Sequence, residues 1–178
     1  MSATGPDLGA IAAAIARSVE QDKREKAAFL KEMREDLLPE ARFALGFIKD
    51  YPEDDANAVP LKAMTVLACW EVLDTIFKKL YSRKVDFATL FGSGTFRPVN
   101  QLLNDARDTR HGVAHIVTVG LVLDTLLKIQ APLQELVHDV VDCLEKWIDE
   151  VAHDDSKRFV RAKFWAYYEA HRKFQPQV

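Results

Sequence analysis

A chain of 178 residues that is 48% apolar and 29% charged has the composition of a globular domain with a substantial core. Its formal net charge of −3 excludes a polycation that binds nucleic acid through overall charge, although a local basic patch can still do so. Seven glycines and seven prolines are too few for the many turns of an all-β fold. The two cysteines, Cys69 and Cys143, lie in apolar helical contexts, which predicts buried thiols in a reducing compartment.

The N-terminal segment has neither the basic start nor the apolar core of a signal peptide. The longest apolar run, residues 116–123, is far shorter than the roughly 20 residues that span a bilayer. We therefore expect a cytoplasmic protein with no membrane partner.

The first 52 residues are predicted to form a long helical extension. Apolar residues recur along it at three- and four-residue steps: Leu8, Ile11, Ala12, Ile15, Phe29, Met33, Leu37, Ala41, Leu45 and Ile48. Residues 20–36 are highly charged, so we expect this middle part to project from the body. Pro39 is expected to kink or divide the helix, because proline lacks the N–H that an interior position needs.

Residues 60–150 are predicted to form the core bundle. Its first helix begins near Pro60, and its inward-facing positions are Leu67, Trp70, Leu73, Phe77 and Leu80. A connection with a short helical turn follows, and Thr95 is a candidate cap for the next helix, which contains Leu102, Leu103 and Ala106. Residues 115–130 begin with β-branched residues that suit a strand, but the chain offers no second strand to pair with it. We predict a helix there, buried nearly all round and kinked or interrupted at Pro132.

The last predicted helix covers residues 156–174, with a candidate cap at residues 154–156. Residues 133–155 carry a net charge of −7 and residues 156–178 a net charge of +5, so these two segments are expected to pack together. Basic and aromatic residues alternate in the last segment, a composition that suits RNA stacking and phosphate contacts. Docking of these aromatic side chains on the core is the favoured alternative. The whole chain is thus predicted to be one all-α domain, a bundle of four to five core helices with a long N-terminal helix and a basic, aromatic C-terminal helix.

Residues 104–115, with the sequence NDARDTRHGVAH, concentrate two arginines, two histidines and two aspartates between apolar helices. Grouped titratable side chains of mixed type mark a candidate site. A helix break at Gly112 would let Arg110 and His115 reach the same space. A guanidinium stabilises the charge on a phosphoryl group and an imidazole exchanges a proton near neutral pH, so the pair suits RNA cleavage by the 2′-hydroxyl without a metal or cofactor. In the alternative, Arg110 pairs with a helix carboxylate and His115 caps a helix.

The run Arg110-His111-Gly112-Val113-Ala114-His115 resembles the Arg-polar-x-x-x-His motif of the HEPN superfamily of small helical bundles. The resemblance covers approximately residues 60–149. It implies a metal-independent endoribonuclease in toxin, defence or RNA-processing systems, acting as a homodimer with both motifs in one cleft. His115 would be the acid/base group and Arg110 the transition-state clamp, with His111 and Asp108 in support and Arg107 on the RNA. The family also has non-catalytic members, so a module that dimerises or binds a partner such as an antitoxin or defence protein is the alternative.

Two further features leave alternatives open. Glu71 lies between Trp70 and Val72, either facing the core as the partner of Arg110 or on a solvated face. The spacing of His138, Asp139, Asp142 and Glu145 is that of metal ligands, but no second His or Cys group completes a site, so we expect an acidic solvated face. Residues 116–127 form a run that is apolar nearly all round and needs more cover than a small bundle provides, so we expect it to be part of the dimer interface.

Overall fold

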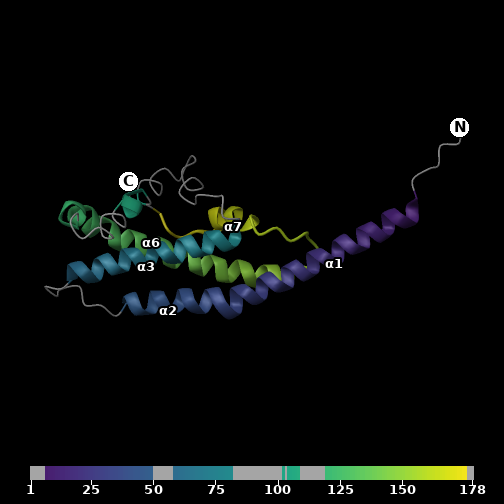
Figure 1. Cartoon of the computed structure of the whole chain (residues 1–178), viewed down its shortest axis with the longest axis horizontal. Coiled ribbons are helices and arrows are strands. Elements are labelled where there is room, and N and C mark those ends of the chain that lie inside the picture. The colour runs from purple at the N-terminus through teal and green to yellow at the C-terminus, as the bar shows by residue number, and fades with distance from the viewer. Residues whose placement is uncertain (1–6, 50–57, 82–101, 103, 109–118, 176–178) are drawn as a thin grey trace, which may run out of the picture.

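Helices make up most of the chain, and the computed structural model describes residues 7–49, 58–81, 102, 104–108 and 119–175, with no strand among them (Figure 1). The elements are α1 (Leu8–Glu32), the π-helix η1 (Met33–Leu37), α2 (Leu38–Lys49), α3 (Ala58–Leu80), α6 (Val119–His153) and α7 (Lys163–His171). Residues 104–108 are also helical. The predicted all-α class is confirmed. No helix within these ranges has the length and apolarity that crossing a bilayer requires.

Helices α1, η1 and α2 form one uninterrupted helical rod from Leu8 to Lys49 (Figure 1). It begins at Leu8, because the Asp7 carboxylate accepts the backbone N–H groups of Gly9, at 3.0 Å, and Ala10, at 3.3 Å, and so caps the first turn. We expected the charged middle of the rod to project from the body, but the part that projects is residues 8–19. The charged middle packs on the body through the buried side chains of Phe29 and Met33.

The π-helix η1 keeps the apolar stripe of the rod on one side. Its buried residues recur at steps of four: Phe29, Met33, Leu37, Ala41 and Leu45. On a regular α-helix each such step overshoots a full turn by about 40°, so four steps would carry the stripe to the opposite side. In η1 the N–H of Leu38 donates to the carbonyl of Met33, five residues back, and this wider turn returns the stripe to the core.

Pro39 does not divide the rod, although division was one of the two outcomes that we expected. It lies in the first turn of α2, directly after η1. A proline ring collides with the carbonyl four residues before it, here that of Glu35, and supplies no N–H to it. The wider π-turn is where such a collision is relieved without a break in the helix.

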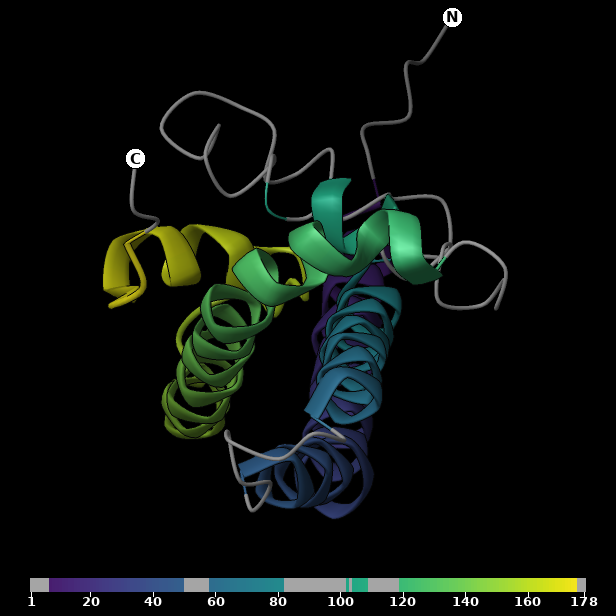
Figure 2. The ribbon, with the colours of Figure 1, turned by 90° about the vertical axis from the view of Figure 1, so that its left-hand side faces the viewer.

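The core lies between α3 and α6, with α2 packed against both and α7 packed against α6 (Figure 2). Helix α3 begins at Ala58, which places Pro60 in its first turn as predicted. Of its predicted inward positions, Trp70, Leu73, Phe77 and Leu80 are buried and Leu67 is half-buried. The largest fully buried side chains come from every part of the fold: Tyr168, Phe29, Phe77, Phe164, Met33, Leu45, Leu73, Ile76 and Leu133.

Helix α6 continues through Pro132 over its 35 residues, so the proline does not interrupt it. Figure 2 shows the first part of α6 running across the end of the bundle and the rest running along it. A proline inside a helix is a common cause of such a change of direction. The side chains of residues 116–127, for which we predicted burial and a dimer interface, lie outside the described part of the chain.

The C-terminal segment differs from the prediction at its start. The carboxylate of Asp154 accepts the backbone N–H and the hydroxyl of Ser156, at 2.9 and 2.5 Å, and this local turn ends α6 instead of capping a new helix. Helix α7 begins only at Lys163. The predicted docking of the aromatic side chains is confirmed, because Phe164, Tyr168 and Phe174 are buried.

Ion pairs join the rod to the acidic face of α6. Arg42 reaches Asp142 at 2.7 Å and Glu145 at 2.5 Å, and Arg34 reaches Asp149 at 3.0 Å. These three carboxylates therefore pair with the rod and not with the basic tail. The tail does pack on α6 as predicted, through α7, and there the Tyr167 hydroxyl donates to Glu150 at 3.0 Å.

Both thiols are buried, as predicted, and are expected to be unreactive in the folded protein. Burial raises the pKa of Cys69 to about 12 and that of Cys143 to about 11. At pH 8 both thiols therefore stay protonated, whereas the thiolate is the nucleophile. Titration with a thiol-reactive disulfide reagent at pH 8 should modify neither cysteine in native protein and both in guanidinium chloride. Rapid modification of the native protein would contradict the burial of that cysteine.

Candidate functional site

The described residues that lead into the motif run from the core to the surface. Leu102 and Ala106 are buried, as the predicted helix requires, whereas Arg107 and Asp108 are exposed. Arg107 Nε lies 3.6 Å from the Asp108 carboxylate. Figures 1 and 2 place this short helical stretch beside the first part of α6. The chain thus presents charged side chains immediately before the motif.

The motif residues Arg110, His111 and His115 lie outside the described residues, so the distances among them stay a prediction. Glu71 is described, and it is an exposed side chain of α3. It therefore occupies a solvent-facing position, one of the two alternatives left open by the sequence, and not a core position. Its pairing with Arg110 stays a prediction because Arg110 lies beyond the described ranges.

The acidic residues of α6 that have the spacing of metal ligands make contacts with other parts of the protein. Asp142 and Glu145 are exposed and paired with Arg42. Asp139, which we assigned to the solvated face, is instead buried, with 8% of its surface exposed. Its carboxylate accepts the backbone N–H of Lys173 at 3.0 and 3.1 Å and that of Phe174 at 2.9 Å. Within the described ranges, no group of three or more His, Cys, Asp or Glu side chains is arranged to hold a metal ion.

Asp139 is a structural anchor that was not predicted from the sequence. The signal was its position between Val137 and Val140, both fully buried, which places it at the edge of an apolar stripe. A carboxylate there needs donors, and two consecutive backbone N–H groups supply them. Burial raises the pKa of the neighbouring Tyr168 hydroxyl, and the negative charge of Asp139 raises this pKa further. Asp139 therefore anchors the C-terminal segment to α6.

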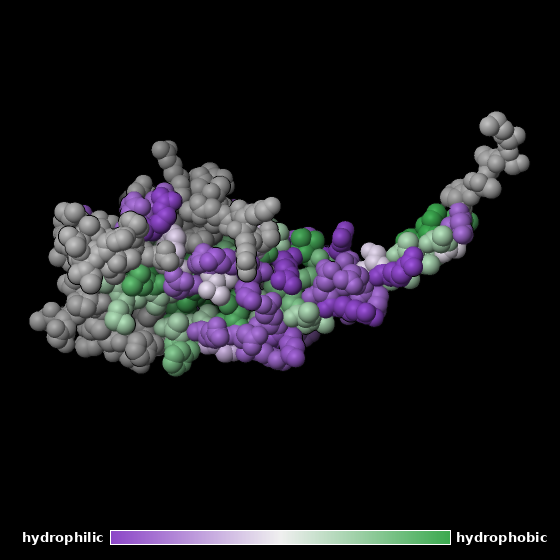
Figure 3. Space-filling view, viewed as in Figure 1, coloured by the Kyte–Doolittle hydropathy of each residue, from purple (hydrophilic) through white to green (hydrophobic). Residues whose placement is uncertain are grey.

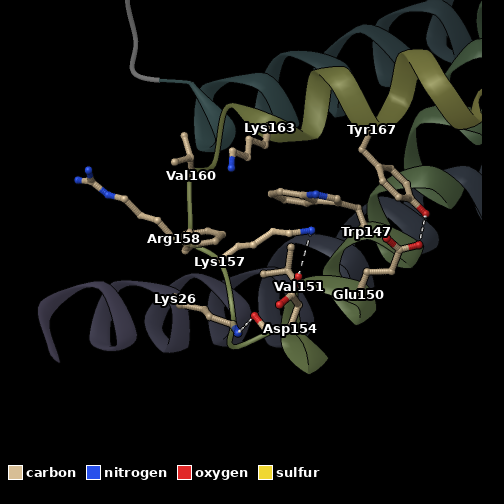
Figure 4. A pocket seen from close by; sticks show the side chains of 11 residues that line it. Lys26, Trp147, Glu150, Val151, Asp154, Lys157, Arg158, Val160, Lys163 and Tyr167 are labelled. Atoms are coloured by element: carbon tan, nitrogen blue, oxygen red, sulfur yellow. Dashed lines mark hydrogen bonds and ion pairs between the residues drawn. The ribbon is translucent and has the colours of Figure 1, made fainter. Parts of the chain in front are cut away.

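A groove of about 180 Å³ lies between the end of α6, the segment 157–160 and α7 (Figure 4). Its lining combines basic, acidic and aromatic side chains: Lys26, Trp147, Glu150, Val151, Asp154, Lys157, Arg158, Phe159, Val160, Lys163 and Tyr167. Lys26 closes one side by donating to the Asp154 carbonyl and the Asp155 carboxylate, both at 2.9 Å. Burial, followed by the hydrogen bond to Glu150, raises the pKa of Tyr167 to about 12, so this hydroxyl stays a donor.

The positive charge of this groove is largely neutralised by neighbouring carboxylates. Lys26 pairs with Asp155 at 2.9 Å, Lys157 with Asp154 at 3.7 Å, and Arg158 with Asp22 at 3.6 Å. A phosphate backbone binds by replacing counterions around free cations, so paired cations attract it less. The aromatic side chains of residues 156–174 dock on the core, the alternative that we favoured.

Comparison of the chain with protein-family models, with curated proteins and with solved structures gave no match. The fold defines an all-α bundle built on a long N-terminal rod. The resemblance to the HEPN superfamily rests on the motif at residues 110–115 alone.

Proposed function

We propose that this protein is a metal-independent endoribonuclease of the HEPN type that acts in the cytoplasm, in a toxin, defence or RNA-processing system. The observation that carries the proposal is the motif Arg110-His111-Gly112-Val113-Ala114-His115. Two features of the described residues support it: the domain is all-α, and the motif lies along the chain between the helical residues 104–108 and α6.

The proposed chemistry is transfer of a phosphodiester to the neighbouring 2′-oxygen of the RNA. One His115 takes the proton from the 2′-hydroxyl as its oxygen forms a bond to phosphorus. The bond from phosphorus to the 5′-oxygen breaks, and a second imidazole gives that oxygen a proton. Arg110 stabilises the negative charge that develops on the phosphoryl oxygens, because its fixed fork matches them. His111 and Asp108 support the pair and Arg107 contacts a neighbouring phosphate.

This chemistry requires both a base and an acid, whereas one motif supplies a single His115. In a homodimer with a two-fold axis near the motif, two His115 and two Arg110 side chains face one phosphate, and two-fold pairs are the commonest oligomers. The products would carry a 2′,3′-cyclic phosphate and a free 5′-hydroxyl.

The alternative function is a non-catalytic helical module that binds a second copy or a partner such as an antitoxin or defence protein. The observation that favours it is the row of exposed aliphatic side chains on α1, formed by Leu8, Ile11, Ile15 and Val19. Exposed apolar rows of this kind mark interaction surfaces.

Incubation of the purified protein with mixed RNA in excess EDTA tests the proposal. We expect cleavage in the chelator with cyclic phosphate ends, and loss of cleavage in His115→Ala. The matched control is His153→Ala, which removes an exposed histidine at the end of α6 and should cleave normally. Dependence on a metal, absence of cleavage, or an active His115→Ala variant would each contradict the proposal. Cleavage by a protein that sediments as a monomer at the assay concentration would contradict the composite site.

A further inference from the structure

The first three turns of α1, residues 8–19, project beyond the rest of the fold, and we call them the arm (Figure 1). Its large aliphatic side chains are exposed: Leu8 at 76%, Ile11 at 45%, Ile15 at 60% and Val19 at 49%. Figure 3 shows apolar side chains gathered towards the tip of the arm. Alanines flank this row on the helix surface and allow another helix to approach closely. A solvent-exposed row of this length calls for a covering surface.

A second apolar surface is a groove of about 320 Å³ between α2 and α3. Its lining is made of apolar and mostly small side chains, with carboxylates among them: Leu37, Glu40, Ala41, Ala44, Ala68, Glu71, Val72 and Thr75. The three alanines leave the space that a larger side chain would otherwise fill. The groove follows two helices for two turns each, which suits a helix as its occupant.

The arm and the groove match in spacing. Along the arm, Leu8, Ile11 and Ile15 are separated by three and then four residues. Along α2 and η1 in the opposite direction, Ala44, Ala41 and Leu37 are also separated by three and then four. An antiparallel arm therefore places Leu8 and Ile11 opposite the small side chains of Ala44 and Ala41, as ridges fit into grooves, and Ile15 beside Leu37. The apolar row of the arm is about 16 Å long, which covers the two turns of the groove.

An arm cannot reach the groove of its own chain. The arm and α2 belong to the same uninterrupted rod, so the arm points away from α2 and has no hinge on which to fold back. We propose that the arm of one copy lies antiparallel in the α2–α3 groove of a second copy, and that the two copies exchange arms about a two-fold axis.

Two arguments favour mutual exchange of arms over docking of a single arm: the buried interface area and the closure of the contact between two copies. Stable interfaces bury roughly 1,600 Å² in total, and one arm of three turns in one groove is a small contact on that scale. Exchange uses two arms and two grooves, which doubles the buried area. Exchange also closes the arm–groove contact between two copies, whereas one-way docking would add copies without end. The contact involves neither Arg110 nor His115 and is separate from the dimer contact proposed at the motif, so its test measures association between arm and groove and not RNA cleavage.

Sedimentation equilibrium at micromolar concentration tests the exchange with two kinds of variant. The arm variant is Ile11→Glu with Ile15→Glu, and the groove variant is Ala44→Glu with Ala68→Glu at two half-buried positions. Glutamate is a good helix former, so both should keep the helical content. The matched control puts the same two charges on the opposite side of the arm, as Ala10→Glu with Ala13→Glu. We expect the arm and groove variants to sediment with half the mass of the wild type and the control, with or without the separate contact proposed at the motif.

Mixing the arm and groove variants distinguishes arm–groove exchange from other contacts. The intact arm of the groove variant can enter the intact groove of the arm variant, so the mixture should associate through one contact of the two, more weakly than the wild type. A mixture that does not associate, or a groove variant that keeps the mass of the wild type because arms pair with arms, would overturn the proposal. A monomeric wild type, as expected if a different protein covers the arm, or an arm variant with the mass of the wild type would also overturn it.

A cross-link locates the contact even where the groove variant fails to fold. One copy with Leu8→Cys and another with Ala44→Cys should form an interchain disulfide on mild oxidation, because the proposed register brings these positions together. A pair with Ala13→Cys in place of Leu8→Cys should not. Equal yields from the two pairs would contradict the register.

Discussion

Replacing Phe29 with alanine is expected to lower the free energy of unfolding by about 3–5 kcal/mol. Phe29 is fully buried and joins three parts of the fold. Its ring centroid lies 5.9 Å from that of Trp147 on α6 and 5.0 Å from that of Phe159, and the Arg161 guanidinium lies 5.0 Å from its centre. Alanine would leave a cavity under the aromatic cluster and remove these ring contacts. Denaturant unfolding, followed by tryptophan fluorescence and by circular dichroism, measures the loss.

The chain offers a matched control in Phe43→Ala. Phe43 lies on α2 with 76% of its surface exposed, so its removal should change the free energy of unfolding by less than about 0.5 kcal/mol. Equal effects of the two substitutions would show that the rod does not pack on α6 through Phe29. Such a result would contradict the fold in its most densely aromatic region.

The Asp139→Asn substitution is expected to lower the free energy of unfolding by about 2–4 kcal/mol. The buried carboxylate accepts the backbone N–H groups of Lys173 and Phe174, and hydrogen bonds to a charged group are the stronger kind. An asparagine of the same shape loses the charge and turns one acceptor into a donor that faces those N–H groups. Denaturant unfolding gives the size of the loss. Hydrogen exchange should show faster exchange of the amides of Lys173 and Phe174.

Asp142→Asn, one turn along α6, is the control for this change. Its carboxylate is exposed and paired with Arg42, and surface ion pairs contribute about 0–1 kcal/mol. The expected loss is therefore under about 1 kcal/mol, with protection of the C-terminal amides unchanged. If Asp139→Asn left those amides protected, the anchoring role of Asp139 would be wrong.

Several elements of the fold were predictable because the sequence carries a local physical signal for them. Asp7 supplies a cap at the start of α1, and Pro60 marks the first turn of α3. The aromatic residues near the C-terminus were correctly assigned to docking, because large rings at helical spacing are more readily buried than left to bind a ligand. The candidate site was predicted from residue types alone, and its geometry at residues 110–115 lies beyond the described ranges.

Other features were not predicted because they depend on tertiary contacts or on a rare local geometry. The repeat of Phe29, Met33 and Leu37 at steps of four is the sequence signal for the π-turn. It resembles an ordinary apolar stripe unless the rotation of that stripe around a regular α-helix is added up. The cap that we assigned at residues 154–156 is instead a local turn. A short carboxylate can accept backbone N–H groups either in such a turn or at the start of a helix, so the sequence does not distinguish the two. Burial of Asp139 depends on Lys173 and Phe174, which are distant in the sequence.

The ion pairs that the rod makes with α6 and with the turn after it have a consequence for alignment more than for stability. Lys26 pairs with Asp155 in that turn, and on α6 Arg34 pairs with Asp149 and Arg42 with Asp142 and Glu145, so the partners recede towards the start of α6 as the rod advances. Aliphatic side chains pack almost equally well when one helix slides past another by a turn, whereas these charges would lose their partners. Each pair adds little to the free energy of unfolding, but together they disfavour every shifted alignment of the two helices. These ion pairs thereby select one antiparallel alignment of the two helices from those that apolar packing alone would allow.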